Sequence, residues 1–181
     1  MARSQLSVAR AVTPEGVVED ATILIEDGRI VSVQPGGGGG ALWAVPGFVD
    51  THCHGAVGVS FGDPDPARNL EAIAHHRAHG TTTIFASTVT EPLGRLQAQL
   101  AVLRALYEAG DLAGIHLEGP FLAPERKGAH DEALLLVPDP ASVERLIAAG
   151  GPALRMITLA VELEHAEAAT RRFTEAGVAV A

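Results

Sequence analysis

Residues 81–117 read TTTIFASTVTEPLGRLQAQLAVLRALYEAGDLAGIHL. An apolar run of strand length at 81–88 is followed by a helical stretch at 93–109, and a second strand-like run follows at 112–117. The helical stretch carries one apolar stripe that can lie on a sheet, because five residues recur at three- and four-residue spacing: Leu93, Leu96, Leu100, Leu103 and Tyr107. Strand, helix and strand in this order predict a parallel βα unit.

The same alternation continues on both sides of this stretch, from residue 46 to Ala181. The other strand-like runs are 48–54, 154–159 and 178–181, and the other helical stretches are 67–79, 141–149 and 165–176. Glycine accepts the left-handed conformation at a helix end, and it follows three of the helical stretches at Gly80, Gly110 and Gly150. This order fits an α/β fold, either an open doubly wound sheet or the first four to five strands of a TIM-type (β/α)8 barrel.

The first 45 residues show short strands and no helical stretch. Strand-like runs lie at 4–12, 21–25 and 29–33, and the Asp27–Gly28 pair between the last two favours a tight hairpin. Five successive glycines within residues 35–40 are costly to order, so they predict a loop. The sequence therefore predicts two domains, a small β unit over residues 1–45 and an α/β domain over residues 46–181.

Composition narrows the classes of function. The 181-residue chain is 47% hydrophobic and 19% charged, enough to bury a core. Its formal net charge of -9 disfavours nucleic acid and anionic membranes as partners. The single cysteine, Cys53, forms no intrachain disulfide, and the first residues lack the long apolar run of a secretion signal or membrane span. We therefore expect a soluble cytoplasmic protein.

Two histidines end the first strand of the α/β domain, in the segment PGFVDTHCHG at 46–55. Side chains at i and i+2 share one face of a strand, so His52 and His54 point the same way, while Cys53 points to the other face. Imidazoles ligate zinc, iron and similar ions, and the carboxyl ends of parallel strands are where α/β enzymes place their sites. The alternative interpretation is a pair of partly buried histidines that hydrogen-bond to their neighbours.

A second polar pair closes a later strand, in the segment GIHLEGPF at 114–121. Glu118 leaves this strand at the same end as the two histidines and can ligate a divalent metal, although it can equally cap a turn or pair with a base. For His116 we expect a buried supporting position. The following loop, 125–130, reads ERKGAH and can offer an imidazole to a polar ligand, or can simply be a solvated loop. The remaining histidines are expected on solvated surfaces: His75, His76, His79 and His165.

Together these segments resemble the N-acetylglucosamine-6-phosphate deacetylases of the amidohydrolase superfamily. PGFVDTHCHG is similar to the first barrel strand of the superfamily, HLEGPF with KGAH is similar to the metal-ligand strand and substrate loop of the deacetylases, and MITLA is similar to their next strand. The resemblance implies a barrel preceded by part of a small β-sandwich. It also implies hydrolysis of N-acetylglucosamine 6-phosphate to glucosamine 6-phosphate and acetate, by a cytoplasmic enzyme that is a homodimer at full length.

The same resemblance implies a role for each matched residue. Glu118 would be the principal ligand of a divalent metal, zinc, iron or similar, and His52 with His54 would serve a second metal position that some members use. Ala129 and His130 would contact the sugar phosphate. The catalytic aspartate and two more metal-binding histidines of the family lie beyond Ala181, so no catalytic residue is expected within these 181 residues.

The chain departs from the family pattern in two respects. Val161–Glu162 stands where the family usually has Pro-Glu, and an eight-stranded barrel needs about 250 residues, more than follow the β unit here. We therefore expect little or no deacetylase activity from the 181 residues alone.

Two alternatives remain open, another amidohydrolase of dihydroorotase-like or aminoacylase-like specificity and a non-catalytic barrel fragment. The absence of an obvious strand-end lysine to bridge two metals speaks against the first.

Overall fold

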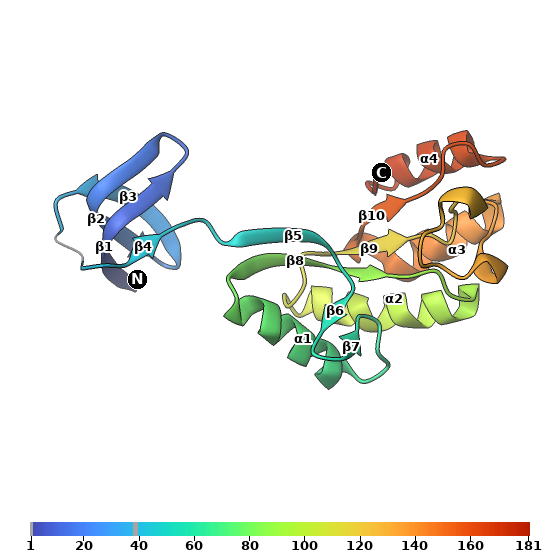
Figure 1. The fold of residues 1–181 in the computed structure, drawn as a ribbon, viewed down its shortest axis with the longest axis horizontal. Helices are drawn as coiled ribbons and strands as arrows, with labels where there is room; N and C mark the ends of the chain where they lie inside the picture. The colour runs from blue at the N-terminus through green and yellow to red at the C-terminus, as the bar shows by residue number, and fades with distance from the viewer. Residues whose placement is uncertain (1, 38–39) are drawn as a thin grey trace. The chain divides into compact units, whose positions relative to one another are not determined.

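The computed structural model describes residues 2–37 and 40–181. The chain divides into two compact units, Met1–Gly47 and Phe48–Ala181 (Figure 1). Among the described residues, no helix is both long and apolar enough to cross a bilayer.

The first unit is a four-stranded sheet with the strand order β3-β2-β1-β4. Its strands are β1 (Arg3–Thr13), β2 (Gly16–Glu26), β3 (Arg29–Pro35) and β4 (Trp43–Ala44). The predicted hairpin is confirmed, because Glu26 pairs with Arg29 across the Asp27–Gly28 turn. A small apolar core lies against the sheet and contains Val8, Ala11, Ala21 and Ile23. The predicted glycine loop begins after β3, and its residues 38 and 39 lie outside the described residues.

The second unit is an α/β fold on a five-stranded parallel sheet with the order β11-β10-β9-β8-β5. Its strands are β5 (Phe48–Cys53), β8 (Thr81–Thr88), β9 (Gly114–Glu118), β10 (Leu154–Thr158) and β11 (Ala179–Val180). Each strand therefore lies beside the next one along the chain. A doubly wound sheet reverses its strand order at a switch point. No reversal occurs among the strands of the described residues, so the open alternative is disfavoured.

Four helices connect these strands: α1 (Pro66–Ala78), α2 (Leu93–Glu108), α3 (Pro140–Gly150) and α4 (Ala166–Glu175). Figure 1 shows α1 and α2 along the same side of β5 and β8. Asp65 and Asp139 begin α1 and α3, because each carboxylate accepts hydrogen bonds from backbone N–H groups of the first turn. The predicted stripe of α2 is buried at Leu96, Leu100 and Leu103 and continues at Leu106. The helix thereby supplies much of the core.

The shorter elements lie in the connections. They are β6 (Gly55–Ala56), β7 (Val59–Ser60), and the 3-10 turns η1 (Pro124–Arg126), η2 (Glu132–Leu134) and η3 (Gly151–Ala153). The strands β6 and β7 pair with each other directly after His54, which follows β5.

The helix ends follow the prediction with one exception. Gly80 and Gly110 follow α1 and α2 with φ of 97° and 84°, the left-handed region that glycine accepts. The prediction for Gly150 is wrong by one residue. Gly150 is the last residue of α3, and Gly151, with φ of 51°, makes the turn into η3.

Candidate metal centre

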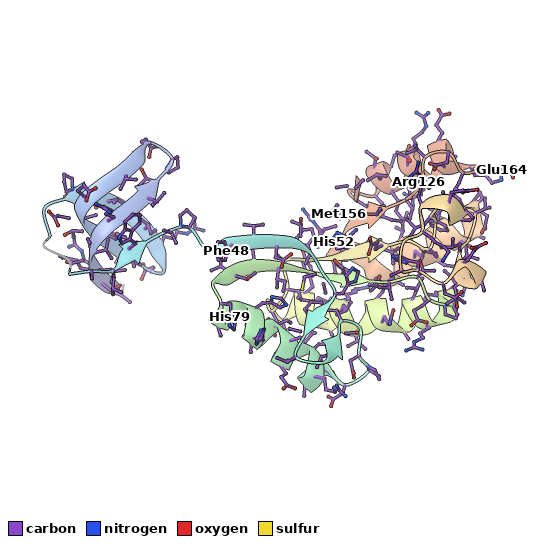
Figure 2. All side chains as sticks on the ribbon, in the orientation of Figure 1. Phe48, His52, His79, Arg126, Met156 and Glu164 are labelled. Atoms are coloured by element: carbon purple, nitrogen blue, oxygen red, sulfur yellow. The ribbon has the colours of Figure 1, made fainter. Side chains whose placement is uncertain are left out.

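Three side chains from two strands meet at the carboxyl end of the parallel sheet. His52 lies near the end of β5 (Figure 2), His54 follows it, and Glu118 is the last residue of β9. His52 Nε2 lies 3.1 Å from His54 Nε2 and 3.2 Å from Glu118 Oε2, and His54 Nε2 lies 2.9 Å from the same oxygen. The structure thus brings together the three residues that the sequence suggested as metal ligands, from positions up to 66 residues apart.

The donor atoms and their spacing fit a divalent cation. Two imidazole nitrogens and one carboxylate oxygen are ligands that zinc and iron accept. Zinc holds such atoms at about 2.0–2.2 Å, so two tetrahedral ligands lie roughly 3.3–3.6 Å apart. The observed separations of 2.9, 3.1 and 3.2 Å are close to that spacing, and small side-chain rotations would complete it.

The ionisation state of Glu118 also favours binding of a cation. Burial acts to raise the pKa of the Glu118 carboxyl, but the charge and hydrogen bond of His52, together with the charges of His54 and His130, outweigh it. The pKa of Glu118 therefore lies below its ordinary value. At neutral pH the site contains a carboxylate rather than a carboxylic acid, as metal binding requires.

His116 supports this cluster from within the sheet, as expected. Its side chain is fully buried, its ring packs edge-on against His52, and its two nitrogens bond to Ser87 and Thr158. Burial above all, with the charge on His52 adding to it, lowers the pKa of His116 to about 4. The ring is therefore neutral at physiological pH, and both of its nitrogens are already engaged.

His130 approaches the cluster from the loop that follows β9. Its Nδ1 atom lies 3.2 Å from the backbone N–H of Thr90 and 2.7 Å from Thr90 Oγ1. A backbone N–H only donates, so Nδ1 is an acceptor and the ring hydrogen is on Nε2, which lies 3.5 Å from Glu118 Oε2. Gly119 leaves room for this arrangement, since a Cβ atom at that position would overlap with Thr90 Oγ1.

One cavity joins the predicted metal and substrate residues. It has a volume of about 500 Å³, and its lining includes His52, His54, Glu118, Ala129 and His130. The basic residues Arg126 and Lys127 also line it, and Lys127 Nζ donates a hydrogen bond to the carbonyl of His130 at 3.1 Å. A polar ligand in this cavity would therefore contact both groups of predicted residues.

The chain is similar in sequence and in structure to deacetylases of N-acetylated amino-sugar phosphates. The N-acetylgalactosamine-6-phosphate deacetylase of Escherichia coli O157:H7 is 33% identical over 184 residues, which cover 97% of this chain and 48% of that protein. A crystal structure of N-acetyl-D-glucosamine-6-phosphate deacetylase from Mycobacterium smegmatis matches with a TM-score of 0.91 at 38% identity, over 97% of this chain and 48% of that one. The chain is a relative of the N-acetylglucosamine-6-phosphate deacetylases.

A second structure of the Mycobacterium smegmatis enzyme, in complex with N-acetyl-D-glucosamine-6-phosphate, matches with a TM-score of 0.89 at 37% identity. It covers 99% of this chain and 49% of that one. The chain thus spans about half the length of the deacetylases it matches. No protein-family model matches it.

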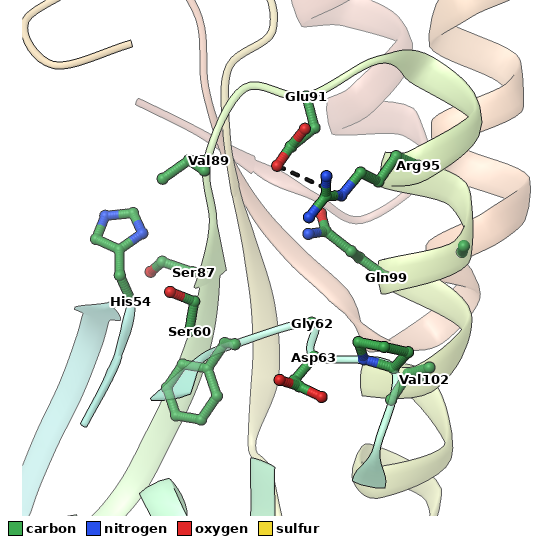
Figure 3. Close-up of a pocket in the computed structure, with 13 residues that line it drawn as sticks. His54, Ser60, Gly62, Asp63, Ser87, Val89, Glu91, Arg95, Gln99 and Val102 are labelled. Carbon is green, nitrogen blue, oxygen red and sulfur yellow. Dashed lines mark ion pairs between the residues drawn. The ribbon is translucent and has the colours of Figure 1, made fainter. Parts of the chain in front are cut away.

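His54 also lines a second cavity, on the side of α2 (Figure 3). This cavity has a volume of about 500 Å³ and contains the ion pair of Glu91 with Arg95, at 3.5 Å. The Nδ1 atom of His54 is buried and has no hydrogen-bond partner among the described residues.

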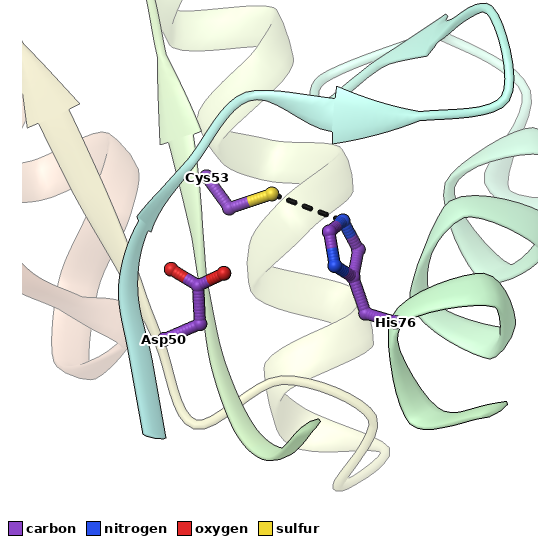
Figure 4. A group of neighbouring side chains, drawn as sticks. All are labelled: Asp50, Cys53 and His76. Atoms are coloured by element: carbon purple, nitrogen blue, oxygen red, sulfur yellow. Dashed lines mark hydrogen bonds between the residues drawn. The ribbon is translucent and has the colours of Figure 1, made fainter. Parts of the chain in front are cut away.

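Cys53 points to the opposite face of β5, as predicted, toward α1 (Figure 4). Its Sγ atom lies 3.0 Å from His76 Nε2, which also lies 3.2 Å from the carbonyl oxygen of Gly55. The expectation of a solvated surface is therefore wrong for His76, which is half-buried, whereas His75 and His79 are exposed. Burial is the main cause that raises the pKa of the Cys53 thiol. The contact ties α1 to β5, the strand that contains His52.

Sequence reasoning missed three hydroxyl side chains around the site, those of Ser87, Thr90 and Thr158. Thr158 was detectable, because it ends β10 as Glu118 ends β9 and the two residues pair in register. Ser87 lies within its strand, and Thr90 lies in the following loop. Nothing in the sequence indicates which side chains these two residues meet.

Proposed function

We propose that the chain is the metal-binding part of an amidohydrolase that converts N-acetylglucosamine 6-phosphate to glucosamine 6-phosphate and acetate. The observation that carries this proposal is the convergence of His52, His54 and Glu118 in one cavity with Ala129 and His130. The similarity to deacetylases over 97% of the chain supports the same reaction.

His52, His54 and Glu118 would hold a divalent metal, zinc, iron or similar. When bound, such an ion supplies a water of lowered pKa and polarises the amide carbonyl. The chain itself contributes the ionised carboxylate of Glu118 and the Nε2–H group of His130, which lies 3.5 Å from Glu118 Oε2 and would donate to an oxygen of the substrate. The general acid and base chemistry would be the role of the aspartate that the resemblance to the family implies.

The loop with Ala129 and His130 would bind the sugar phosphate. The overall charge of -9 repels an anion, so binding needs local basic groups, and Arg126 and Lys127 line the same cavity. A second candidate substrate is N-acetylgalactosamine 6-phosphate, because the Escherichia coli relative carries that name.

The five parallel strands in sequential order support a finer description, the first five strands of a TIM-type barrel. The four-stranded sheet of the first unit would be part of the small β-sandwich. A cytoplasmic location, a homodimer at full length and the absence of nucleic-acid and membrane partners remain predictions. Weak or absent activity of the 181 residues alone remains a prediction as well.

Metal content and activity together test this function. Zinc bound per chain would be measured by atomic emission after gentle purification, for the unaltered chain, Glu118→Gln, His52→Ala and the exposed control His165→Ala. We expect about one metal per chain, lost in the first two variants and kept in the control. Equal metal content in all four proteins, or no metal in any, would exclude this site and favour a non-catalytic fragment.

The substrate is tested in a separate assay on the same proteins. Hydrolysis would be followed as release of acetate from both N-acetylated sugar phosphates, as ring opening of a cyclic ureide and as release of the free amino acid from an N-acyl amino acid. Turnover of the sugar phosphates alone supports the proposal, even if the rate is low. Turnover of a ureide or an acyl amino acid instead would identify the alternative amidohydrolase.

A further inference from the structure

A row of hydrogen bonds crosses four neighbouring strands beneath the candidate metal centre. The backbone N–H of Cys53 in β5 donates to Ser87 Oγ in β8 at 3.0 Å, and Ser87 Oγ lies 3.0 Å from His116 Nδ1 in β9. On the other side of the ring, His116 Nε2 lies 2.8 Å from Thr158 Oγ1 in β10. The row therefore connects the strand of His52 and His54 with the strand of Glu118 and then with β10.

Because Ser87 and His116 are buried, each hydrogen bond of this row has a defined donor and a defined acceptor. Ser87 is 1% exposed and His116 is 0% exposed, so neither can exchange a partner for bulk water. A backbone N–H can only donate, so Ser87 Oγ accepts from Cys53 and its own hydrogen goes to His116 Nδ1. A neutral ring that accepts at Nδ1 carries its hydrogen on Nε2, and that hydrogen is donated to Thr158 Oγ1.

The opposite tautomer leaves a fully buried hydroxyl without an acceptor, although Thr158 could then donate to Nε2. If Nδ1 carried the hydrogen, Ser87 Oγ would accept from both Cys53 and His116, and the Ser87 hydroxyl hydrogen would have no acceptor among the described residues. An unsatisfied buried donor loses its hydration without compensation. The directed row is therefore the more stable arrangement.

The hydroxyl hydrogen of Thr158 is the end of this row. Thr158 is partly exposed and lines the cavity that also contains Glu118 and His130. Its oxygen is occupied as an acceptor by His116, and the described residues offer its hydrogen no acceptor. A threonine in this situation is a hydrogen-bond donor to whatever fills the cavity.

We propose that Thr158 is a further binding residue that donates its hydroxyl hydrogen to a carboxylate or amide oxygen of the ligand, and that Ser87 and His116 are positioning residues that set its direction. The ligand side of this proposal rests on the function proposed above. The direction of the row does not depend on a metal or on activity.

The tautomer of His116 tests the direction of the row. Nitrogen–proton correlation spectra of the ¹⁵N-histidine-labelled, metal-free chain report which ring nitrogen carries the hydrogen. We expect it on Nε2 in the unaltered chain, in Thr158→Ser and in Thr158→Val, because all three keep Ser87, and a mixture of tautomers in Ser87→Ala. A hydrogen on Nδ1 in the unaltered chain would overturn the proposal, even if Ser87→Ala failed to fold.

Acetate, the carboxylate product of deacetylation, tests the donor at the end of the row. Its affinity for the zinc-loaded chain would be measured by NMR titration. We expect Thr158→Val to weaken it about fivefold or more and Thr158→Ser to stay within about twofold. Equal affinities of Thr158→Val and the unaltered chain would refute the donor. Failure to bind zinc would count against the metal centre alone, and the tautomer would still decide the direction of the row.

Discussion

The imidazole Nε2 of His130 lies 3.5 Å from the Oε2 atom of Glu118, although the two residues belong to different segments. Glu118 ends a strand of the parallel sheet, and His130 lies in a loop after the 3-10 turn η1. The proposed substrate loop therefore reaches the proposed metal ligand directly. A substitution that changes the position of one of these two side chains should therefore change the position of the other.

Thr90 holds His130 in this orientation, so Thr90→Val should release it. The substitution removes a 2.7 Å hydrogen bond to a largely buried imidazole, and we expect a loss of about 1–3 kcal/mol in the free energy of unfolding. Urea denaturation would measure the loss. Thr90→Ser keeps the hydroxyl and serves as the control, and equal losses in the two variants would contradict a stabilising role for the hydroxyl.

Zinc should stabilise the folded chain, because the unfolded chain has no preformed site. At a zinc concentration of about 100 times Kd, we expect roughly 2.7 kcal/mol of added stability, which a chelator should reverse. Glu118→Gln should abolish the gain, whereas the exposed control His165→Ala should keep it. Thermal melts with and without zinc would measure the effect, and an undiminished gain in Glu118→Gln would place the ion elsewhere.

The metal-free chain should lose stability as the pH falls from 6.5 to about 4. His116 has its folded pKa lowered to about 4, so below pH 6.5 the unfolded state takes up a proton that the folded state refuses. The lowered pKa of Glu118 acts in the same direction. We expect a loss of a few kcal/mol across this range, because one pKa unit corresponds to about 1.4 kcal/mol.

Urea denaturation at several pH values measures this loss, and proton NMR of the His116 ring provides a direct control. The ring resonances should show no titration between pH 5 and 8. A midpoint near 6.5 would contradict the burial of a neutral ring.

Substitution of a buried leucine of α2 tests how much the packing of this helix on the sheet stabilises the protein. Leu100 is completely buried, so Leu100→Ala should cost about 2–5 kcal/mol through lost burial and the cavity that remains. Val161→Ala is the matched control, because Val161 is 75% exposed, and it should change stability by less than about 0.5 kcal/mol. Chemical denaturation of both variants would separate the two outcomes.

By itself, the sequence determined the alternation of strands and helices and the residue types at the strand ends. The apolar spacing of α2 and the period of two that aligns His52 with His54 are local properties, and each follows from the geometry of one element. The resemblance to deacetylases predicts that Ala129 and His130 contact the substrate, and this stays a prediction. The local properties do not depend on which distant segments meet.

Only the tertiary structure decided the strand order, the position of Gly151 in place of Gly150, and the partners of Ser87, Thr90 and Thr158. The strand order depends on how the helices pack, and several orders satisfy the same pattern of burial. A hydroxyl group shows no periodicity, and its partner depends on the register between strands that are far apart in the chain. For that reason the candidate metal ligands could be predicted from the sequence, whereas the hydrogen bonds around them could not.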